Sequence, residues 1–358
     1  MGVGSPTASA KSLDRTIGGR TPLTASSIAA LCVAAAASAA ALCAQAAPPT
    51  YHVIDRIAGP DGRWDYVRVD AAHNRVLVAH GTSVTAVDLA TKAVASKLAP
   101  GALLHDAMPV GAGAEFVVTD GGAGKAVFVD AKTGAVVATV QAGKNPDAAA
   151  YDAHSGLVLV MNHSGGDITL IDAKTHAVAA TVAVGGDLEA AVVDGTGRAF
   201  VNVEDKNQIA VVDIAGRKVV ARYALTACEG PTGIAYDAAD HMLIAACDGA
   251  TAFVDARTGK VLQTLETGKG ADGVAYDPRQ QLAFVPSGRG GTLEVIAVRP
   301  GKSIVVQTIL TQVSARTIAL DERTGRLYLP SASYGPPVTV GGRPTLTPGS
   351  FRLIVVGR

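Results

Sequence analysis

The sequence predicts an all-β protein, and three observations support that class. A short phrase, which consists of a hydrophobic residue plus Asp followed by a turn, recurs at a nearly fixed interval. Its Asp residues step by 42, 42, 41 and 42 positions: Asp88, Asp130, Asp172, Asp213 and Asp255. A second hydrophobic-plus-Asp phrase interleaves with it, and its last four steps are 42, 43, 40 and 44 positions. Short runs rich in β-branched residues fill the intervals. A period near 40 of this composition is typical of a β-propeller blade.

We expect a seven-bladed β-propeller with four-stranded blades. The blades begin at successive inner strands and lie near 64–101, 102–144, 145–186, 187–230, 231–270, 271–315 and 316–358. The last blade lacks one strand, and the strand-like segment 50–57 can supply it. The N- and C-terminal strands then close the ring, which leaves no exposed sheet edge. Six or eight blades are the alternatives, and they require a merged or a hidden repeat.

The first 46 residues differ from the rest, and we predict that they are a signal peptide. Three basic residues form a leader, and an apolar, Ala-rich run follows from Ile28 to Cys43. The small-residue sequence Ala-Gln-Ala then places the cleavage site near Ala46. A retained membrane anchor is the alternative, for which the run is short. The propeller, residues 47–358, is therefore expected to be periplasmic or secreted, without a membrane span.

The charge balance argues against nucleic acid as the main partner. The chain has 31 basic and 31 acidic residues, and only 4% of its residues are aromatic. A nucleic-acid surface needs a basic excess, and a single-strand platform needs aromatic rings on which bases stack. We expect a monomer that binds a small ligand or a periplasmic protein.

Cysteine usage agrees with an oxidising compartment. Two of the four cysteines leave with the signal, so Cys228 and Cys247 remain. Cys228 precedes the expected inner strand 232–236, and Cys247 follows the antiparallel neighbour 242–246, which brings the two residues close together. We predict a disulfide between them, and two free buried thiols are the alternative.

Several motifs recur in the turns and the last strands. They are the Val-Asp-Ala-Lys/Arg-Thr-Gly turns at 129–134 and 254–259, the phrases at 231–237 and 315–321, and the closing segment 350–358. With these motifs, residues 50–358 resemble the YVTN-repeat propellers, in particular the YncE-like family of exported bacterial proteins. The literal Tyr-Val-Thr-Asn is absent. The resemblance implies a periplasmic or surface binding protein, and a shared fold does not imply a reaction.

A ring of charged residues is expected at one mouth of the central channel. Counting back five positions from the end of each inner-strand phrase gives Asp65, Asp106, Asp147, Glu189, Thr232, Asp272 and Arg316. The second copy ends with Gly111 instead of Asp, so Asp106 rests on the alignment alone. Arg316 can neutralise Asp272 and Asp65. Three acids on consecutive blades are then left without a basic partner in the ring, and these are the expected ligand contacts.

Histidines are expected on the same face as these acids. His105 precedes Asp106, and loops between second and third strands add His80, Asp120, Asn162, His163, Glu204 and Asp248. Like charges held together raise one another's pKa or recruit a cation. Imidazole and carboxylate ligands together suit zinc or a transition metal. The predicted metal ligands are Asp106, Asp147, Glu189, His80, His105 and His163.

Three interpretations of the acidic face remain open. In the first, the acids cap loop N–H groups and bind nothing. In the second, the face binds a ligand, a metal or a protein partner. In the third interpretation the protein is a metal-dependent, lactonase-like hydrolase, in which the metal polarises an ester carbonyl. The sequence identifies no catalytic residue and no cofactor apart from a possible divalent metal.

A long connection in the last blade also lies on the expected acidic face. Residues 331–350 are rich in Pro and Gly. Loops of this length are uncommon unless they are functional or disordered. We expect the segment to cover part of the channel mouth as a lid or partner contact, with Tyr334 as its contact residue.

Overall fold

The structure, a computed structural model, describes residues 1–2, 50–336 and 344–358. One compact unit spans Pro49–Arg358, and the description below concerns that unit. Apart from residues 1–2, the predicted signal lies outside the described residues, so it stays a prediction. No helix in the described part of the chain is long and apolar enough to cross a membrane.

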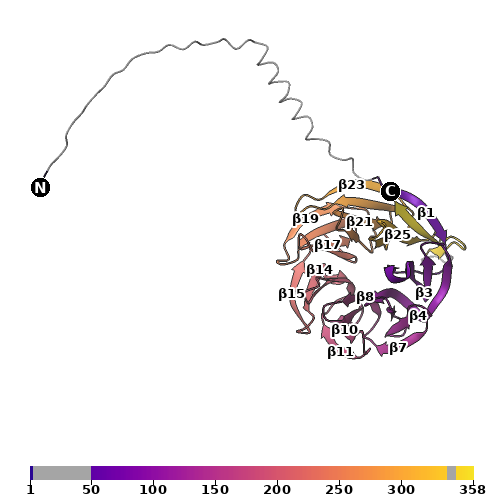
Figure 1. The fold of residues 1–358 in the computed structure, drawn as a ribbon. Helices are drawn as coiled ribbons and strands as arrows, with labels where there is room; N and C mark the ends of the chain where they lie inside the picture. The colour runs from indigo at the N-terminus through magenta and orange to yellow at the C-terminus, as the bar shows by residue number, and fades with distance from the viewer. Residues whose placement is uncertain (3–49, 337–343) are drawn as a thin grey trace, which may run out of the picture. The chain divides into compact units, whose positions relative to one another are not determined.

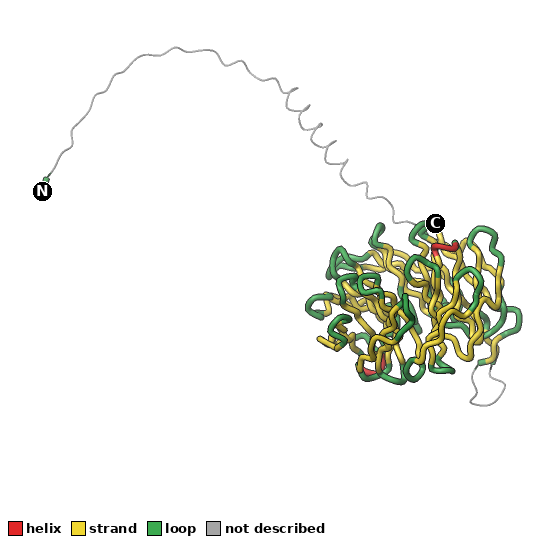
Figure 2. The backbone as a smooth tube through the Cα atoms, turned by 60° about the horizontal axis from the view of Figure 1, so that its bottom comes forward, coloured by secondary structure: helices red, strands yellow, loops and turns green. Residues whose placement is uncertain are grey.

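Strands form nearly all of the regular structure (Figure 2). Among the described residues the helical elements are two 3-10 turns, η1 (Ala71–His73) and η2 (Glu204–Lys206). The sheets follow one another around a central axis (Figure 1). The prediction of an all-β propeller is therefore confirmed.

Four of the sheets consist of four consecutive antiparallel strands each. The first contains β8 (Pro146–Asp152), β9 (Leu157–Asn162), β10 (Asp167–Asp172) and β11 (Val178–Ala183). The second contains β12 (Leu188–Val193), β13 (Arg198–Val203), β14 (Gln208–Asp213) and β15 (Lys218–Ala224). The third contains β16 (Ile234–Asp237), β17 (Met242–Cys247), β18 (Ala250–Asp255) and β19 (Val261–Glu266). The fourth contains β20 (Ala275–Asp277), β21 (Leu282–Ser287), β22 (Thr292–Ala297) and β23 (Ile304–Leu310).

A fifth four-stranded sheet joins the two ends of the domain. Its strands, in spatial order, are β1 (His52–Ala58), β28 (Arg352–Gly357), β25 (Arg326–Ser331) and β24 (Ala319–Asp321). β1 pairs antiparallel with β28 from His52 opposite Gly357 to Ala58 opposite Arg352. The N-terminal strand therefore supplies the outer strand of the last sheet, as expected from the sequence.

The remaining large sheet has six strands. They are β2 (Val67–Asp70), β3 (Arg75–Asp88), β4 (Val94–Val110), β5 (Glu115–Asp120), β6 (Lys125–Asp130) and β7 (Val136–Gln141). The first half of β3 pairs with β2 and its second half with the first half of β4, whose second half pairs with β5. The pairing thus gives six sheets of four or more strands, where seven were predicted. β4 runs without a break through residues 101–102, where the first blade was expected to end.

The repeated Asp explains why the strands that end with it are followed by a tight turn. The Oδ1 atom of Asp130 accepts hydrogen bonds from the backbone N–H of Lys132 and Thr133 and from the Thr133 hydroxyl, at 3.1, 2.8 and 2.7 Å. Gly134 then adopts a φ of 73°, which favours glycine. The same contacts recur at Asp88, Asp172 and Asp255. These carboxylates form Asx turns, so the motif that predicts the fold has a structural role.

The hydrophobic core lies between neighbouring sheets. One cluster joins Phe253 and Ile244 of one sheet to Val285 and Ile296 of the next. The largest fully buried side chains include a set of phenylalanines on these facing surfaces: Phe116, Phe128, Phe200, Phe253, Phe284 and Phe351. Packing of sheet against sheet therefore leaves the inner strands free to line the channel.

The predicted disulfide is present. Cys228 and Cys247 are bonded, their Cα atoms are 5.4 Å apart, and both residues are buried. The pairing confirms the argument that the start of one strand lies beside the end of its antiparallel neighbour.

The long connection of the last sheet contains a short ribbon. β26 (Tyr334–Gly335) pairs with β27 (Thr345–Leu346), and residues 337–343 between them lie outside the described residues. The Tyr334 ring lies 6.1 Å from the ring of Trp64, at the channel mouth. The predicted lid role of residues 331–350 stays a prediction.

Candidate functional site at the channel mouth

Each inner strand begins at the same end of the central channel, and contacts between side chains connect these positions. Arg316 Nε lies 2.6 Å from Asp272 Oδ2, and Arg316 Nη2 lies 3.6 Å from Asp65 Oδ1. His105 Nδ1 lies 2.7 Å from Asp65 Oδ2 and 2.9 Å from Asp147 Oδ1. We use the name mouth ring for Asp65, His105, Asp147, Glu189, Thr232, Asp272 and Arg316. The prediction that Arg316 neutralises Asp272 and Asp65 is confirmed.

The sequence alignment placed Asp106 in this ring, and that placement is wrong by one residue. The inner strand ends at Val110 and not at Gly111, because Val110 is the residue that pairs with Glu115 at the turn. Counting back five positions from Val110 gives His105. The lack of an Asp at the end of this phrase concealed the shift.

Asp106 lies one residue further along the strand and is fully buried. Arg68 donates from Nε to Oδ1 at 2.9 Å and from Nη2 to Oδ2 at 2.6 Å. The backbone N–H groups of Ala107 and Ala149 donate to the same carboxylate at 2.8 and 3.0 Å. Asp106 was predicted to lack a basic partner in the ring, and its basic partner, Arg68, indeed lies outside the mouth ring. Four donors satisfy its lone pairs and leave none for a metal.

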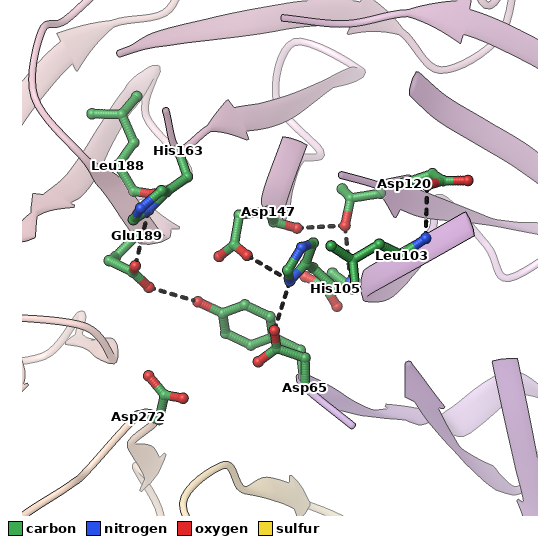
Figure 3. A network of polar contacts seen from close by, with 12 residues as sticks. Asp65, Leu103, His105, Asp120, Asp147, His163, Leu188, Glu189 and Asp272 are labelled. Carbon is green, nitrogen blue, oxygen red and sulfur yellow. Dashed lines mark hydrogen bonds and ion pairs between the residues drawn. The ribbon is translucent and has the colours of Figure 1, made fainter. Parts of the chain in front are cut away.

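The first His–carboxylate group consists of His105, Asp65 and Asp147 (Figure 3). One ligand atom from each residue lies within 4.8 Å of the other two. A single Nδ1–H faces two carboxylate oxygens, so the group has fewer donors than acceptors. His105 Nε2 is buried and has no hydrogen-bond partner within the described residues. We call this group the Asp65 triad.

The charges of the Asp65 triad depend on one another. Burial opposes the positive charge on His105, but hydrogen bonds to Asp147 and Asp65 outweigh it and raise the pKa of the imidazole to about 10. Burial raises the pKa of Asp147 to about 6, although the hydrogen bond from His105 works against it. The triad therefore holds a proton strongly at neutral pH, and a cation that binds there has to displace it.

A second group lies on the next sheet and consists of His163, Glu189 and Glu204. His163 Nδ1 is 3.1 Å from Glu189 Oε1 and 3.1 Å from the Leu188 carbonyl oxygen. The hydrogen bond to Glu189 raises the pKa of His163 to about 9. Burial raises the pKa of Glu189 to about 8, against the effect of His163, and burial also raises the pKa of Glu204. We call this group the Glu189 triad.

Tyr66 lies between the two triads. Its hydroxyl donates to Glu189 Oε2 at 3.5 Å, and its side chain is buried. Burial, followed by the charges of Asp147 and Glu189, raises its pKa well above the ordinary value. Tyr66 therefore stays a neutral donor among acids.

The other side of the mouth ring is already paired. Thr232 donates its hydroxyl to the Ala271 carbonyl at 2.9 Å. Burial raises the pKa of Asp272, and Arg316, which holds it, also donates from Nη2 to the Trp64 carbonyl at 3.0 Å. These residues lie where the sequence placed them, and their partners are one another or the carbonyl groups of neighbouring residues.

His80 does not reach the ring carboxylates. It is buried against Phe351, with ring centroids 4.5 Å apart, and its Nδ1 lies 3.4 Å from the Thr85 hydroxyl. Burial lowers its pKa, so it is neutral. The grouping of His80 with the metal ligands is not supported by its position.

Three of the loop residues named from the sequence make turn contacts instead of ring contacts. Asp120 accepts from the N–H groups of Ala102 and Leu103, at 2.8 and 3.1 Å. Asn162 accepts from the N–H of Gly143 at 3.0 Å, and Asp248 from that of Gly270 at 2.9 Å. Only His163 and Glu204 of that set join a triad.

The space beside the Asp65 triad is small. A cavity lined by Trp64, Asp65, Leu104 and His105, among others, has a volume of about 10 Å³. One water molecule needs roughly that much room. The cavity itself has room for a single ion or water molecule.

Sequence interpretation missed Tyr66 and Arg68. Both follow Asp65 at alternate positions of the strand that lines the channel, so their side chains share one face. The available signal for these two residues was a Tyr and an Arg at alternate positions directly after an acid.

The comparisons with known proteins support the fold. No protein-family model matches the chain, and no curated protein matches it. A chain in a solved structure titled "Crystal Structure of Mitotic Checkpoint Complex" is similar, with a TM-score of 0.71 and 14% sequence identity. The match covers 87% of this chain and 96% of that chain. At this identity the likeness shows the fold alone, and that fold is the β-propeller.

Proposed function

We propose that this protein is a β-propeller binding protein whose channel mouth binds a divalent cation. The observation that carries the proposal is the Asp65 triad, in which one imidazole and two carboxylates direct their ligand atoms to a common point. Mixed nitrogen and oxygen ligands suit zinc, manganese or another transition metal better than calcium. Two of the triad residues, Asp65 and His105, also line the cavity of about 10 Å³, which has room for an ion.

The distances in the triad fit exchange of a proton for a metal. Nδ1 and the two carboxylate oxygens are 2.7 and 2.9 Å apart, as in hydrogen bonds. Ligand bonds of about 2.0–2.2 Å in tetrahedral geometry separate ligand atoms by roughly 3.3 Å. Each side chain therefore has to move by about half an ångström, which rotation about side-chain bonds supplies. The Glu189 triad has the same composition, one imidazole and two carboxylates, but the proposal is confined to the Asp65 triad.

We also propose that the six-stranded sheet represents two blades, near 64–101 and 102–144, so that the propeller has seven. The N–H of Leu89 donates to the Asn74 carbonyl at 2.9 Å, which joins the two ends of β3. The N–H of Ala131 makes the same contact with Ala114 in the following strands. This contact supports a β3 that folds back on itself as a hairpin.

Export and family membership complete the proposal. The disulfide between Cys228 and Cys247 agrees with an oxidising compartment, and the basic leader with its apolar run agrees with a cleaved signal. Both fit an exported protein, and we propose that it is a monomeric, periplasmic YncE-like protein with the YVTN-type repeat.

Titration calorimetry tests the cation proposal. Residues 47–358 are titrated at pH 8 with Zn²⁺, Mn²⁺ and Ca²⁺, alongside His105→Gln and the control His154→Gln, which changes an exposed histidine in a turn. We expect binding of Zn²⁺ or Mn²⁺ that His105→Gln abolishes and His154→Gln preserves. No heat and no shift in melting temperature with any of the metals would exclude the cation site.

A lactonase-like hydrolase is the second candidate, and the environment of Glu189 favours it. A carboxyl group whose pKa is raised to about 8 is suited to proton transfer near neutral pH. A metal in the Asp65 triad would supply Lewis acidity. Metal-loaded protein should then hydrolyse a simple lactone, and Glu189→Gln should lose that activity while it retains the metal.

A further inference from the structure

A second cavity lies at the other end of the propeller and is lined with arginines. Its volume is about 410 Å³, within the range of small-molecule pockets. The lining comes from the turns after β20 and β24 and from the end of β28, with Arg279, Arg323, Arg326 and Arg358 among its residues. Mouth-ring residues lie at or before the first residues of the inner stretches and the turns of this pocket follow the inner strands, so the pocket opens on the opposite face.

Stacking and hydrogen bonds hold two guanidinium groups of this pocket in position. Arg358 stacks on Tyr51 at 5.1 Å and donates to its hydroxyl at 3.3 Å. Arg323 donates to the Ala71 carbonyl and to Asn74 Oδ1, at 3.2 and 3.1 Å. Side chains fixed in this way lose little further freedom when a ligand binds.

The nearby acids are already satisfied in their own turns. Asp277 is fully buried and accepts from Gln280 Nε2 at 2.6 Å and from the N–H of Arg279 at 3.0 Å. Asp321 is buried and accepts from Arg323 Nε at 3.0 Å. Asp321 therefore neutralises Arg323, and Asp277 lies near Arg279. No Asp or Glu side chain lines the pocket among the described residues.

Two of the four arginines have no acidic partner. Among the described residues neither Arg326 nor Arg358 forms an ion pair, and Arg279 Nε is 3.7 Å from Asp277, too far for a hydrogen bond. Arginine presents a planar fork of N–H donors that matches the oxygens of phosphate and carboxylate groups. We propose that this arginine pocket binds a small multivalent oxyanion, a molecule that carries two or more phosphate or carboxylate groups.

Calorimetry with pyrophosphate and with citrate tests the pocket and distinguishes the two oxyanion types. Measurements use the metal-free protein at low ionic strength, Arg326→Gln and Arg358→Gln as test variants, and Arg257→Gln as a control with the same change of charge in an exposed turn. Loss of a charge-assisted hydrogen bond weakens binding by about tenfold or more. We expect that loss in each test variant and none in the control. Arg279→Gln, at a side chain that is 59% exposed, repeats the test where folding is not at risk.

Two outcomes would overturn the proposal. One is the absence of binding of both anions at millimolar concentration. The other is an equal loss of affinity in Arg257→Gln and in the test variants, which would mean general attraction to a basic surface. Asp147→Asn, in the mouth ring, should leave anion binding unchanged, so failure here is distinguishable from failure of the cation site.

Discussion

The central channel contains two carboxylate sites close together that differ in how well their oxygens are satisfied. Inside the channel, Asp106 accepts from four donors, among them both arms of the Arg68 guanidinium, and is inaccessible to solvent. At the mouth, Asp65 and Asp147 share one imidazole N–H. Arg68 and Asp106 belong to different inner strands, β2 and β4, so the satisfied site connects neighbouring parts of the fold. The unsatisfied site has oxygens available for a cation.

The largest expected effect is at the satisfied site. Asp106→Asn leaves the buried side of Arg68 without its counter-charge, and breaking a buried ion pair lowers the free energy of unfolding by about 3–5 kcal/mol. Because the Arg68 side chain is 28% exposed, we expect the lower end of that range. Chemical denaturation measures the change.

Asp65→Asn is the matched control for this prediction. It makes the same chemical change at the mouth, where the side chain is 21% exposed, and we expect a loss of less than about 1 kcal/mol. Equal losses in the two variants would mean that the sites do not differ as described. Metal binding by folded Asp106→Asn should match that of the wild type.

The next effect is at the mouth and concerns affinity instead of stability. Asp147→Asn removes a metal ligand. Replacing a residue that only orients a ligand typically lowers metal affinity by roughly 10–100-fold. We expect a larger loss of metal affinity here. Since burial already disfavours ionisation of Asp147, the metal-free variant should unfold at nearly the same denaturant concentration as the wild type. A large loss of stability with unchanged metal affinity would make Asp147 a structural residue.

The stability of the metal-free protein should depend on pH because of the titratable groups at the channel mouth. Glu189 and Asp147 have pKa values raised to about 8 and about 6, so the folded state binds more protons than the unfolded chain. These two carboxyl groups therefore lower the free energy of unfolding as pH rises through these values. The stabilisation from His105 is complete below its unfolded pKa of about 6.5 and is lost as pH rises toward 10. The melting temperature should therefore be lower at pH 9 than at pH 6.

A metal should reverse this trend, because binding requires deprotonated ligands and strengthens as pH rises. Glu189→Gln should flatten the metal-free profile between pH 5 and 8. A wild-type profile that rises over this range would contradict the assigned proton affinities.

The smallest effect is electrostatic. Arg316 Nη2 lies 3.6 Å from Asp65 and its positive charge opposes a bound cation. Arg316→Gln should therefore tighten metal binding severalfold, and the gain should shrink at high salt. Isothermal titration at 20 and 300 mM salt measures it, and weaker binding in the variant would mean that Arg316 positions the carboxylates.

The fold was predictable because its signals are local. The Asp130 turn and its copies repeat at a fixed interval, and each is satisfied by atoms within three residues. The disulfide was predictable for a similar reason, since Cys228 and Cys247 flank neighbouring strands. The predicted break between the first two blades does not appear as a division between sheets, because β4 continues through residues 101–102 and joins both parts in one six-stranded sheet.

The mouth site was only partly predictable. The spacing located Asp65, Asp147 and Glu189, but a phrase that ends without Asp shifted the assignment from His105 to Asp106. The partner of Asp106 is Arg68, 38 positions earlier, and no local pattern connects the two residues. Long-range pairs of this kind depend on strand register, which the sequence fixes only to within one residue here.

The metal content of the purified protein tests the central claim most directly. Residues 47–358, exported to the periplasm and purified without chelators or added metal, are analysed by mass spectrometry beside His105→Gln and Asp106→Asn. We predict near-stoichiometric metal in the wild type and in the folded fraction of Asp106→Asn, and none in His105→Gln. Equal metal content in the wild type and in His105→Gln, or none in either after metal loading at pH 8, would contradict the account of the mouth as a cation site.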